Sequence, residues 1–529
     1  MRIRLGRPER QVLPLRWQDS AWWRGAAVLS AGALPSLAFP APSLWWFAYV
    51  SLVPWMLLVR AAPTARRAAL DGWLGGTGFM LAVHHWLLPS LNVFIVALAA
   101  LLGLLWAPWG WLVRRMLGGV VVASRVAAAL LVVPSGWLMV ELVRSWQGLG
   151  GPWGLLGSSQ WQVGPALRLA SVGGVWLVSV LVVAVNTAVV ALLVGGSART
   201  TAATGVVACV VVTGAASLWA PRPAENGRTR IAVVQPGIVE GEDARFARSE
   251  ALTRELAEHH VDLVVWGESS VGHDLATRPD LARRIAALSR LTGADILVNV
   301  DARRSDETGI YKSSVLVGPA GLTGDRYDKM RLVPFGEYVP ARSVLGWATA
   351  VGRAAGEDRR RGTRQVVMTL PDGLRVGPLI CFETAFPDMP RQLTRDGTQV
   401  LVAQSATSSF QHSWAPEQHA SLAALRAAET GRPMVHATLT GVSAVYGPDG
   451  RRVGSRLGTD RSAAAVYDVP LSEGTTLYVR FGDWPVPAAL AVLALLCAVE
   501  GLQALRRPVP KPAAPHAHTA RESAEPPER

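Results

Sequence analysis

The chain has 529 residues, half of them hydrophobic and 21 of them Trp. It is long for one globular domain and too apolar for a wholly water-soluble protein. The formal net charge is +13, but the basic residues are spread along the chain and form no basic face interleaved with aromatic residues, so we expect no nucleic-acid partner. Residues 21–220 contain almost no Asp or Glu, whereas residues 221–480 mix charged and apolar residues as soluble domains do. The two regions are therefore suited to different solvents, lipid and water.

The N-terminal stretch, Met1 to Gln18, is basic and carries five Arg, and apolar segments follow it. A cleaved signal peptide is the competing interpretation, but the basic region is long and apolar segments continue well beyond it. Each segment is close to the ~20 residues that cross the hydrocarbon core of a bilayer. We therefore predict seven membrane spans before residue 221, at about 22–40, 43–59, 70–89, 91–113, 120–143, 166–195 and 202–220, and an eighth at Pro485–Leu505.

Basic residues mark every second loop between these spans. They are Arg60, Arg66 and Arg67, then Arg114, Arg115 and Arg125, then Arg199, whereas loops 40–43 and 89–92 contain no Lys or Arg and loop 144–168 has only Arg144 and Arg168. Because Lys and Arg accumulate in cytoplasmic loops, both termini are expected in the cytoplasm and residues 221–480 outside it.

The region after residue 220 has the pattern of a layered α/β domain. The linker Pro221–Gly227 opens it, and helical patterns at about 246–259, 278–291 and 416–429 alternate with short β-branched runs. These strand-like runs lie at 230–235, 261–266, 295–300, 311–317, 365–369, 375–380, 398–403, 433–438 and 442–446. We predict four parts: a membrane domain over 1–220, this α/β domain over 221–480, a returning span over 481–506 and a disordered tail over 507–529.

Cys381 is the strongest candidate nucleophile. Cys209 and Cys497 lie inside apolar runs, so Cys381 is the one thiol in the polar domain, and no disulfide can form within that domain. It follows the apolar strand-like run that ends at Ile380, where a rigid element would hold a thiol toward a substrate. A buried core cysteine is the alternative interpretation.

A thiol of ordinary pKa needs a base and a cation nearby to react at neutral pH. Glu268 follows the strand-like run 261–266, and Lys329 lies in a loop rich in Pro and Gly. As a base, Glu268 must come within ~3 Å of the thiol and have its pKa raised toward neutrality by burial. The alternative for Glu268 is a solvated carboxylate at a strand end, and the alternative for Lys329 is a surface lysine. Lys312, Lys329 and Lys511 are the only lysines in the chain, so a lysine beside the proposed site is informative.

The order Glu268, Lys329, Cys381 resembles the Glu-Lys-Cys triad of the nitrilase superfamily. Within that superfamily, the phrase Pro334–Pro340 and the flanking spans resemble the apolipoprotein N-acyltransferase family over residues 20 to 505. The resemblance implies a multi-span α-helical membrane domain and, outside the membrane, an α/β nitrilase-like αββα sandwich. It also implies supporting roles for Glu337 and Glu383, and for Phe382 where relatives carry Tyr. A further departure is Gln404–Phe410, where relatives carry an Asn-Asp-Ala-Trp-Phe type stretch.

Two more residues are assigned to substrate binding by the resemblance, Tyr338 within the phrase and Trp153 within the loop Gly150–Gln160. For Trp153 the alternative is an aromatic anchor in the headgroup layer. Glu141 and Arg144, just before that loop, are interpreted as a pair at a helix end. Residues 341–363, rich in Arg and Gly, are a candidate mobile arm, with an ordinary exposed loop as the alternative.

The resemblance implies an acyltransferase of the bacterial plasma membrane that needs no cofactor or metal. The donor is a phospholipid whose acyl chain forms a thioester on Cys381, and the acceptor is the N-terminal cysteine amine of a diacylglyceryl-modified apolipoprotein. Two alternatives stay open. One is a membrane-tethered carbon-nitrogen hydrolase, an amidase or nitrilase that uses water in the second half-reaction, and the other is a membrane scaffold or transporter with an inactive outer domain.

Overall fold

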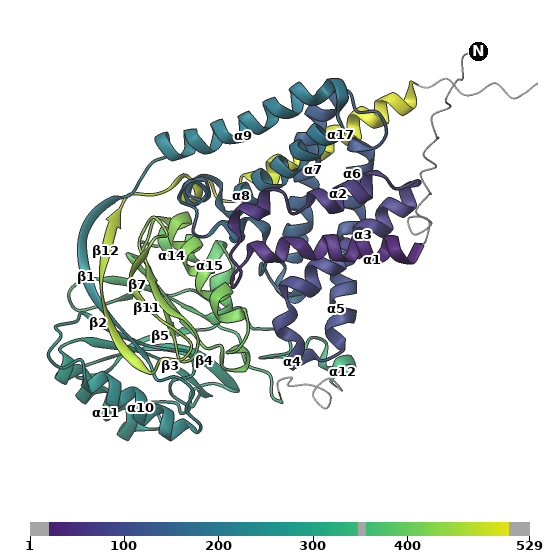
Figure 1. Ribbon diagram of the computed structural model, residues 1–529. Helices are drawn as coiled ribbons and strands as arrows, with labels where there is room; N and C mark the ends of the chain where they lie inside the picture. The colour runs from purple at the N-terminus through teal and green to yellow at the C-terminus, as the bar shows by residue number, and fades with distance from the viewer. Residues whose placement is uncertain (1–20, 347–355, 507–529) are drawn as a thin grey trace, which may run out of the picture.

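The structure is a computed structural model that describes residues 21–346 and 356–506 (Figure 1). The basic N-terminal stretch, the tail predicted to be disordered and residues 347–355 of the predicted arm lie outside the described residues. The short helix α12 (Arg342–Leu345) precedes these nine residues. After them, the Arg359 backbone N–H donates to Glu337 O at 2.8 Å.

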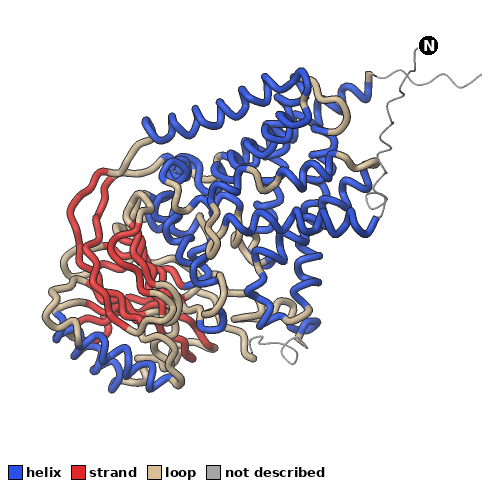
Figure 2. The backbone as a smooth tube through the Cα atoms, viewed as in Figure 1, coloured by secondary structure: helices blue, strands red, loops and turns tan. Residues whose placement is uncertain are grey.

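The N-terminal part is a bundle of helices (Figure 2). Within the described residues, five helices are long and apolar enough to cross a membrane, at Phe94–Leu117, Ala123–Arg144, Gly164–Val194, Gly196–Trp219 and Pro485–Leu505. The first two predicted spans correspond to shorter helices and the third to the 19-residue helix Ala65–Val83, which contains Arg66, Arg67 and Asp71, so the total of eight spans remains a prediction. The bundle comprises α1 (Ala21–Ala33), α2 (Val53–Arg60), α3 (Ala65–Val83), α4 (Leu88–Leu91), α5 (Phe94–Gly103), α6 (Ala107–Leu117), α7 (Ala123–Arg144), α8 (Gly164–Val194), α9 (Arg199–Trp219) and α17 (Pro485–Leu505).

The second part contains two six-stranded sheets, in the orders β12-β1-β2-β3-β4-β5 and β11-β10-β9-β8-β7-β6. Parallel pairing of β1, β2 and β3 in one sheet and of β7, β8 and β9 in the other brings their carboxyl ends to one edge of each sheet. The strands are β1 (Ala224–Gln235), β2 (Leu263–Trp266), β3 (Asp295–Arg303), β4 (Ile310–Gly318), β5 (Gly321–Asp328), β6 (Met368–Thr369), β7 (Arg375–Ile380), β8 (Val400–Ser405), β9 (Met434–Thr438), β10 (Ser443–Tyr446), β11 (Arg452–Leu457) and β12 (Ala463–Glu473).

The nine predicted strand-like runs all overlap strands, the run 365–369 only at Met368–Thr369, but β5, β11 and β12 were not predicted. β5 contains Gly321 and Gly324, and β12 contains Pro470, which weakens an apolar strand pattern. Each of these three strands lies at the edge of its sheet, where turn-forming residues and Pro are tolerated.

The sheets pack face to face with helices on both outer surfaces, so the domain is an αββα sandwich (Figure 1). Val265 and Leu297 of the first sheet and Leu379 and Val402 of the second belong to one buried core between the sheets. α10 (Glu242–Arg254) and α11 (Pro279–Thr292) cover the first sheet, and α14 (Asp388–Arg395) and α15 (Ala415–Thr430) lie against the second. This confirms the predicted fold class.

α15 also joins the sandwich to the helical bundle. Leu425 and Ala428 on α15 share a buried cluster with Leu167 and Ala170 of α8. α8 departs from helical geometry at Gly173 and Gly174, and the freed backbone N–H of Val175 donates to Oε1 of Glu429 at 2.7 Å. The break in α8 therefore creates an internal helix start that a carboxylate of α15 occupies.

Candidate active site

Glu268 lies at the carboxyl end of β2, one residue after Gly267. A β carbon on Gly267 would lie 1.9 Å from the backbone N of Leu439, so only glycine allows the second sheet to approach this closely. The Glu268 backbone N–H donates to Ser405 O at 3.2 Å, which joins the two sheets. Glu268 is buried, with 2% of its surface exposed. The next residue, Ser269, has φ +55°, which turns the chain sharply and leaves the carboxylate inside.

Lys329 follows β5 and is fully buried. Its Nζ donates to Oε1 of Glu337 at 2.7 Å and to Oε1 of Glu268 at 3.1 Å. Its backbone N–H donates to Lys312 O at 2.8 Å, so the neighbouring strand β4 fixes its position. The structure thus brings together Glu268, Lys329 and Glu337 as the sequence predicts.

A second lysine, which the sequence pattern does not assign to the site, lies in the same cluster. Nζ of Lys312 on β4 donates to Oε1 of Glu268 at 2.9 Å and lies 3.2 Å from Oε1 of Glu337 and 3.7 Å from Oδ2 of Asp301. The rarity of lysine in this chain was the available signal. Lys312 sits inside a strand, however, where a long polar side chain is usually solvent-facing.

Glu337 belongs to a loop that folds back on itself. Its Oε2 accepts the Val333 backbone N–H at 2.8 Å while its Oε1 faces both lysines. Phe335, two residues earlier, has φ +63° and donates its backbone N–H to Tyr338 O at 2.7 Å. The loop thus fixes one carboxylate oxygen and leaves the other for the lysines.

Cys381 is the first residue after β7 and has φ +51°. A non-glycine residue in this conformation costs about 1–2 kcal/mol, which surrounding contacts must offset. The charges of Glu268, Lys329, Lys312 and Glu337 all act on its thiol, and its carbonyl oxygen lies 3.0 Å from Nε2 of His419. The nucleophile candidate therefore lies at the carboxylate–lysine cluster, on a strained turn.

Glu383 provides the contacts that hold this turn. Its Oε2 accepts the Ile380 backbone N–H at 2.8 Å, and its Oε1 accepts the Met330 backbone N–H at 2.7 Å, the Arg331 backbone N–H at 3.0 Å and the Tyr327 hydroxyl at 2.7 Å. One buried carboxylate thus ties the Cys381 turn to the segment that carries Lys329.

The electrostatics differ from expectation at Glu268. Burial raises the pKa of this carboxyl, but the charges of Lys312 and Lys329 outweigh burial and bring the pKa down to about 2. The expected rise toward neutrality was therefore wrong, because it did not include a second lysine. Burial and the Glu268 charge raise the pKa of the Cys381 thiol to about 12, against the opposing effect of Lys329 and Lys312. In the substrate-free site the thiol is protonated and the carboxylate ionised.

Phe382 links this site to the helical bundle. Its ring packs edge to face against Phe386 with centroids 5.0 Å apart. A β carbon on Gly151, in the loop after α7, would lie 2.7 Å from Phe382 Cζ and 2.8 Å from Phe386 Cζ, so the loop backbone lies directly on these rings. The Phe382 ring, at the position where the resemblance leads us to expect Tyr, therefore lies between the loop and the nucleophile turn.

Trp153 lies in the same loop and is 8% exposed. Its indole N–H donates to Oε1 of Gln418 at 2.8 Å, and its ring lies 5.4 Å from His419 and 5.3 Å from Trp86. A headgroup anchor would be exposed to lipid, so this interpretation is wrong for Trp153. Its ring instead contacts His419, the side chain that bonds Cys381 O.

Glu141 and Arg144 form hydrogen bonds with this loop and not with each other. Oε1 of Glu141 accepts the Leu156 backbone N–H at 2.7 Å, and Arg144 Nη1 donates to Trp153 O at 2.6 Å. No ion pair is present between them among the described residues, so their interpretation as a helix-end pair is replaced by a role in fixing the loop.

Tyr338 has a different position. Its ring lies under the Arg361 guanidinium, 5.1 Å away, and it lines a cavity of about 600 Å³ with Leu332, Arg303 and Arg359. Cys381 is not among the residues that line this cavity. Substrate binding by Tyr338 remains a prediction. Across residues 21–346 and 356–506, no group of three or more His, Cys, Asp or Glu is arranged to hold a metal ion.

Comparisons with known proteins cover both parts of the chain. A family model described as apolipoprotein N-acyltransferase N-terminal domain matches residues 31–188, and one described as carbon-nitrogen hydrolase matches residues 230–477. The apolipoprotein N-acyltransferases of Azotobacter vinelandii and Pseudomonas aeruginosa are each 31% identical, over 91% and 92% of this chain and 96% and 98% of theirs. A solved amidase of the nitrilase superfamily from Nesterenkonia is 18% identical, over 48% of this chain and 93% of its own, with a TM-score of 0.34, which adds nothing to the fold already described.

Proposed function

The chain belongs to the apolipoprotein N-acyltransferase family, and from this premise we propose how its own residues perform acyl transfer. The protein is a membrane-embedded acyltransferase. The proposed donor is a phospholipid and the proposed acceptor is the free amine of a diacylglyceryl-modified N-terminal cysteine on an apolipoprotein. The observation that carries the proposal is the buried cluster of Glu268, Lys329 and Lys312, whose charges act on the Cys381 thiol.

In the first half-reaction, Sγ of Cys381 attacks the ester carbonyl of the donor. The S–C bond forms, the ester C–O bond breaks, and the thiol proton passes through Glu268 to the alcohol oxygen of the departing lysophospholipid. Because the resting thiol is protonated, its deprotonation accompanies the attack. Lys329, which is cationic since Glu268 and Glu337 raise its pKa despite burial, is positioned to stabilise the oxyanion.

In the second half-reaction, the acceptor amine attacks the thioester. The N–C bond forms, the C–S bond breaks, and the amine proton returns through Glu268 to the thiolate. A thioester is activated toward amines, so one nucleophile serves both halves. Glu337 keeps Lys329 in place, and Glu383 is a positioning residue that holds the nucleophile turn.

Lys312 adds a second positive charge to the cluster. Two lysines face Glu268 and Glu337, and Asp301 lies 3.7 Å from Lys312 Nζ and 3.4 Å from Arg359 Nε. This near balance of buried charges keeps Glu268 ionised. We propose that Lys312 is a positioning residue that acts on the reaction through Glu268.

Aromatic side chains next to the cluster suit an acyl chain. The Trp86 ring lies 4.8 Å from Phe410 and 5.3 Å from Trp153; Trp86 and Phe410 lie in short 3-10 helices and Trp153 in the loop after α7. Leu88, Val93 and Phe94, which follow Trp86 in the chain, also expose apolar surface. We propose that the lipid chain approaches the nucleophile along these apolar side chains, because each CH₂ kept out of water is worth about 0.8 kcal/mol.

The alternation of basic loops supports cytoplasmic termini and an extracytoplasmic catalytic domain in a bacterial inner membrane. This orientation remains a proposal. A thiol reagent that cannot cross membranes, applied to intact spheroplasts with Cys497→Ser and Cys209→Ser protein, should label Cys381; protection until lysis would contradict it.

The reaction is tested by incubating purified protein with phospholipid alone and measuring intact mass. The expected result is an acyl adduct on Cys381 that a diacylated lipopeptide discharges and water hardly discharges. Rapid discharge by water would establish the hydrolase alternative, and absence of an adduct would establish the scaffold alternative. Cys497→Ser protein should form the same adduct and Cys381→Ala protein none.

A further inference from the structure

Four arginines surround a hollow at the end of the bundle that faces away from the sandwich. Arg60 lies at the end of α2, Arg114 and Arg115 at the end of α6, and Arg125 at the start of α7. Arg115 pairs with Glu500, near the end of α17, whereas α7 and α17 reach the sandwich with their opposite ends (Figure 1). The hollow therefore lies at the membrane face opposite the candidate active site.

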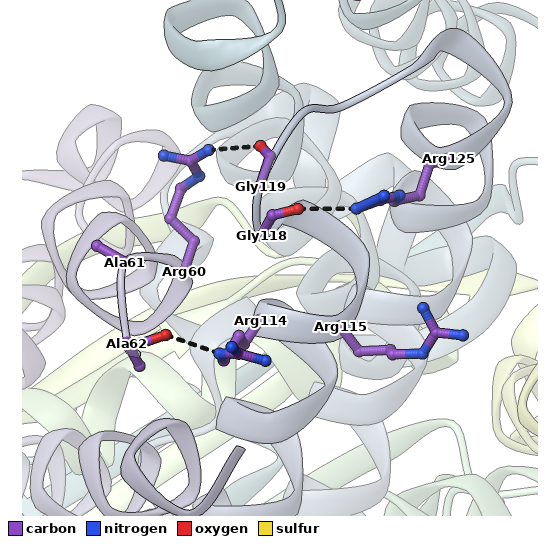
Figure 3. Close-up of a pocket in the computed structure, with 8 residues that line it drawn as sticks. All are labelled: Arg60, Ala61, Ala62, Arg114, Arg115, Gly118, Gly119 and Arg125. Atoms are coloured by element: carbon purple, nitrogen blue, oxygen red, sulfur yellow. Dashed lines mark hydrogen bonds between the residues drawn. The ribbon is translucent and has the colours of Figure 1, made fainter. Parts of the chain in front are cut away.

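The hollow has a volume of about 360 Å³, and no Asp or Glu lines it (Figure 3). Among the described residues, Glu500 is the one carboxylate that pairs with these arginines, at 2.8 Å from Arg115 Nη2. Three guanidinium charges are thus gathered without a carboxylate partner. Like charges that line one hollow repel one another, so the arrangement favours a bound anion.

Main-chain carbonyls fix the direction of three of the side chains. Arg60 donates to Leu117 O at 3.0 Å. Figure 3 shows Arg60 donating to Gly119 O at 3.2 Å, Arg114 to Ala62 O at 2.7 Å and Arg125 to Gly118 O at 2.7 Å. Capping of helix ends alone is the simpler explanation. A cap uses one or two N–H groups of a guanidinium, however, and each guanidinium has five, so donors remain in a fixed orientation.

The surroundings of the hollow distinguish a lipid from a free anion. Val120 and Val122, in the α6–α7 connection beside Gly118 and Gly119, are 85% and 50% exposed, and Trp111 on α6 is 39% exposed. Charged donors next to exposed apolar and Trp side chains are typical of the membrane–water boundary. Guanidinium groups bind phosphate oxygens in bidentate geometry.

We propose that this hollow binds the phosphate group of a phospholipid in the leaflet opposite the catalytic domain. The lipid phosphate accepts hydrogen bonds from Arg60, Arg114 and Arg125, and its acyl chains lie along Val120 and Val122. The site is distinct from the donor site at Cys381, and it links the ends of α2, α6 and α7 through one ligand.

The test uses full-length protein purified in mild detergent and native mass spectrometry with added phosphatidylglycerol. Arg60→Gln combined with Arg125→Gln should weaken lipid retention about tenfold, since two charge-assisted contacts are lost. Arg66→Gln combined with Arg199→Gln also removes two charges, from exposed positions at the starts of α3 and α9, and should retain lipid as wild type does. Equal lipid retention by both variants would overturn the proposal. Binding of inorganic phosphate alone to wild-type protein as strongly as the lipid would also overturn it.

A second measurement does not depend on how the variant folds. Wild-type protein is crosslinked to a phospholipid that carries a photoreactive headgroup, and the adducts are mapped by peptide mass. Crosslinks in residues 57–66 and 111–126 are expected, and crosslinks confined to other segments would contradict the site. Acyl-adduct formation on Cys381 in the double variant should match wild type, which separates this proposal from that of the catalytic reaction.

Discussion

At the residue scale, the reactive group depends on neighbours that come from separate strands. Three residues with positive φ flank the site, namely Ser269 after Glu268, Phe335 before Glu337, and Cys381 itself. Strain of this kind persists only where surrounding contacts fix the backbone, and here Glu383 supplies several of them. The site is therefore preorganised before substrate binds.

The raised pKa of Cys381 gives a testable pH dependence. A thiol with a pKa of about 12 is protonated at neutral pH, so its thiolate fraction should rise about tenfold per pH unit across the range from 7 to 10. The rate of alkylation by iodoacetamide should follow that rise in protein with Cys209→Ser and Cys497→Ser. A plateau below pH 8 would show that the thiolate is already formed in the resting site.

Replacing Lys312 tests the second cation. Lys312→Gln should slow acyl-enzyme formation about 10²-fold, a loss of about 3 kcal/mol of stabilisation. Its charge lowers the pKa of Glu268, so in the variant that pKa should rise, and activity should be lost at a higher pH than in wild type as the pH falls. Single-turnover adduct formation against pH measures both effects.

Lys312→Arg is the control for charge, and it should keep the acid limb of the profile near that of wild type. An unchanged rate and an unchanged profile in Lys312→Gln would show that Lys312 is only a structural residue.

At the element scale, the junction between a membrane loop and the nucleophile turn decides access to the site. Trp153 and Gly151 come from the loop after α7, whereas Phe382 and His419 come from the sandwich. The two sets contact each other directly, so displacement of the loop should alter the nucleophile environment without changing the triad.

Gly151→Ala should therefore impair acyl transfer about tenfold or more, because its β carbon would collide with Phe382 and Phe386. Gly150→Ala is a matched control. Gly150 also has positive φ, at +97°, but nothing lies within 4 Å of its β carbon. Both variants carry the backbone strain of a left-handed alanine, so equal loss of acyl-adduct formation in both would remove the argument from contact with Phe382.

The sequence predicts Glu268, Lys329 and Cys381 because each follows an apolar run or lies in a distinctive loop. It does not predict Lys312, since a lysine within a strand gives no sign of which face it occupies until β3, β4 and β5 pair. The same limit explains the wrong direction for the pKa of Glu268. Trp153 was open to a lipid-facing interpretation because its hydrogen bond to Gln418 joins residues 265 positions apart.

At the scale of the whole molecule, Glu429 couples the two domains. Burial raises its pKa to about 7, against the opposing effect of Arg426 and the Val175 N–H. The folded state then binds this proton more tightly than the unfolded state, whose Glu has a pKa near 4.3. The stability that this group contributes is present at low pH and is lost as the pH rises through about 7.

Thermal unfolding in detergent between pH 5 and pH 8 should therefore show a decrease in stability of roughly 3 kcal/mol from this residue. Glu429→Gln should remove that decrease, since its side chain no longer ionises. Glu417→Gln, on the same helix and paired with the exposed Arg456, should keep the wild-type slope. A slope that is the same in all three proteins would contradict the coupling.

α15 is at once an outer layer of the sandwich and the partner of the broken helix α8. Exchange of the sandwich domain between relatives would therefore cut through a shared packing surface if the breakpoints were placed at residues 221 and 480. A working chimera would need a matched α8 from the same parent. For the same reason, the sandwich expressed without its spans should expose the α15 face and aggregate, even with every reactive side chain intact.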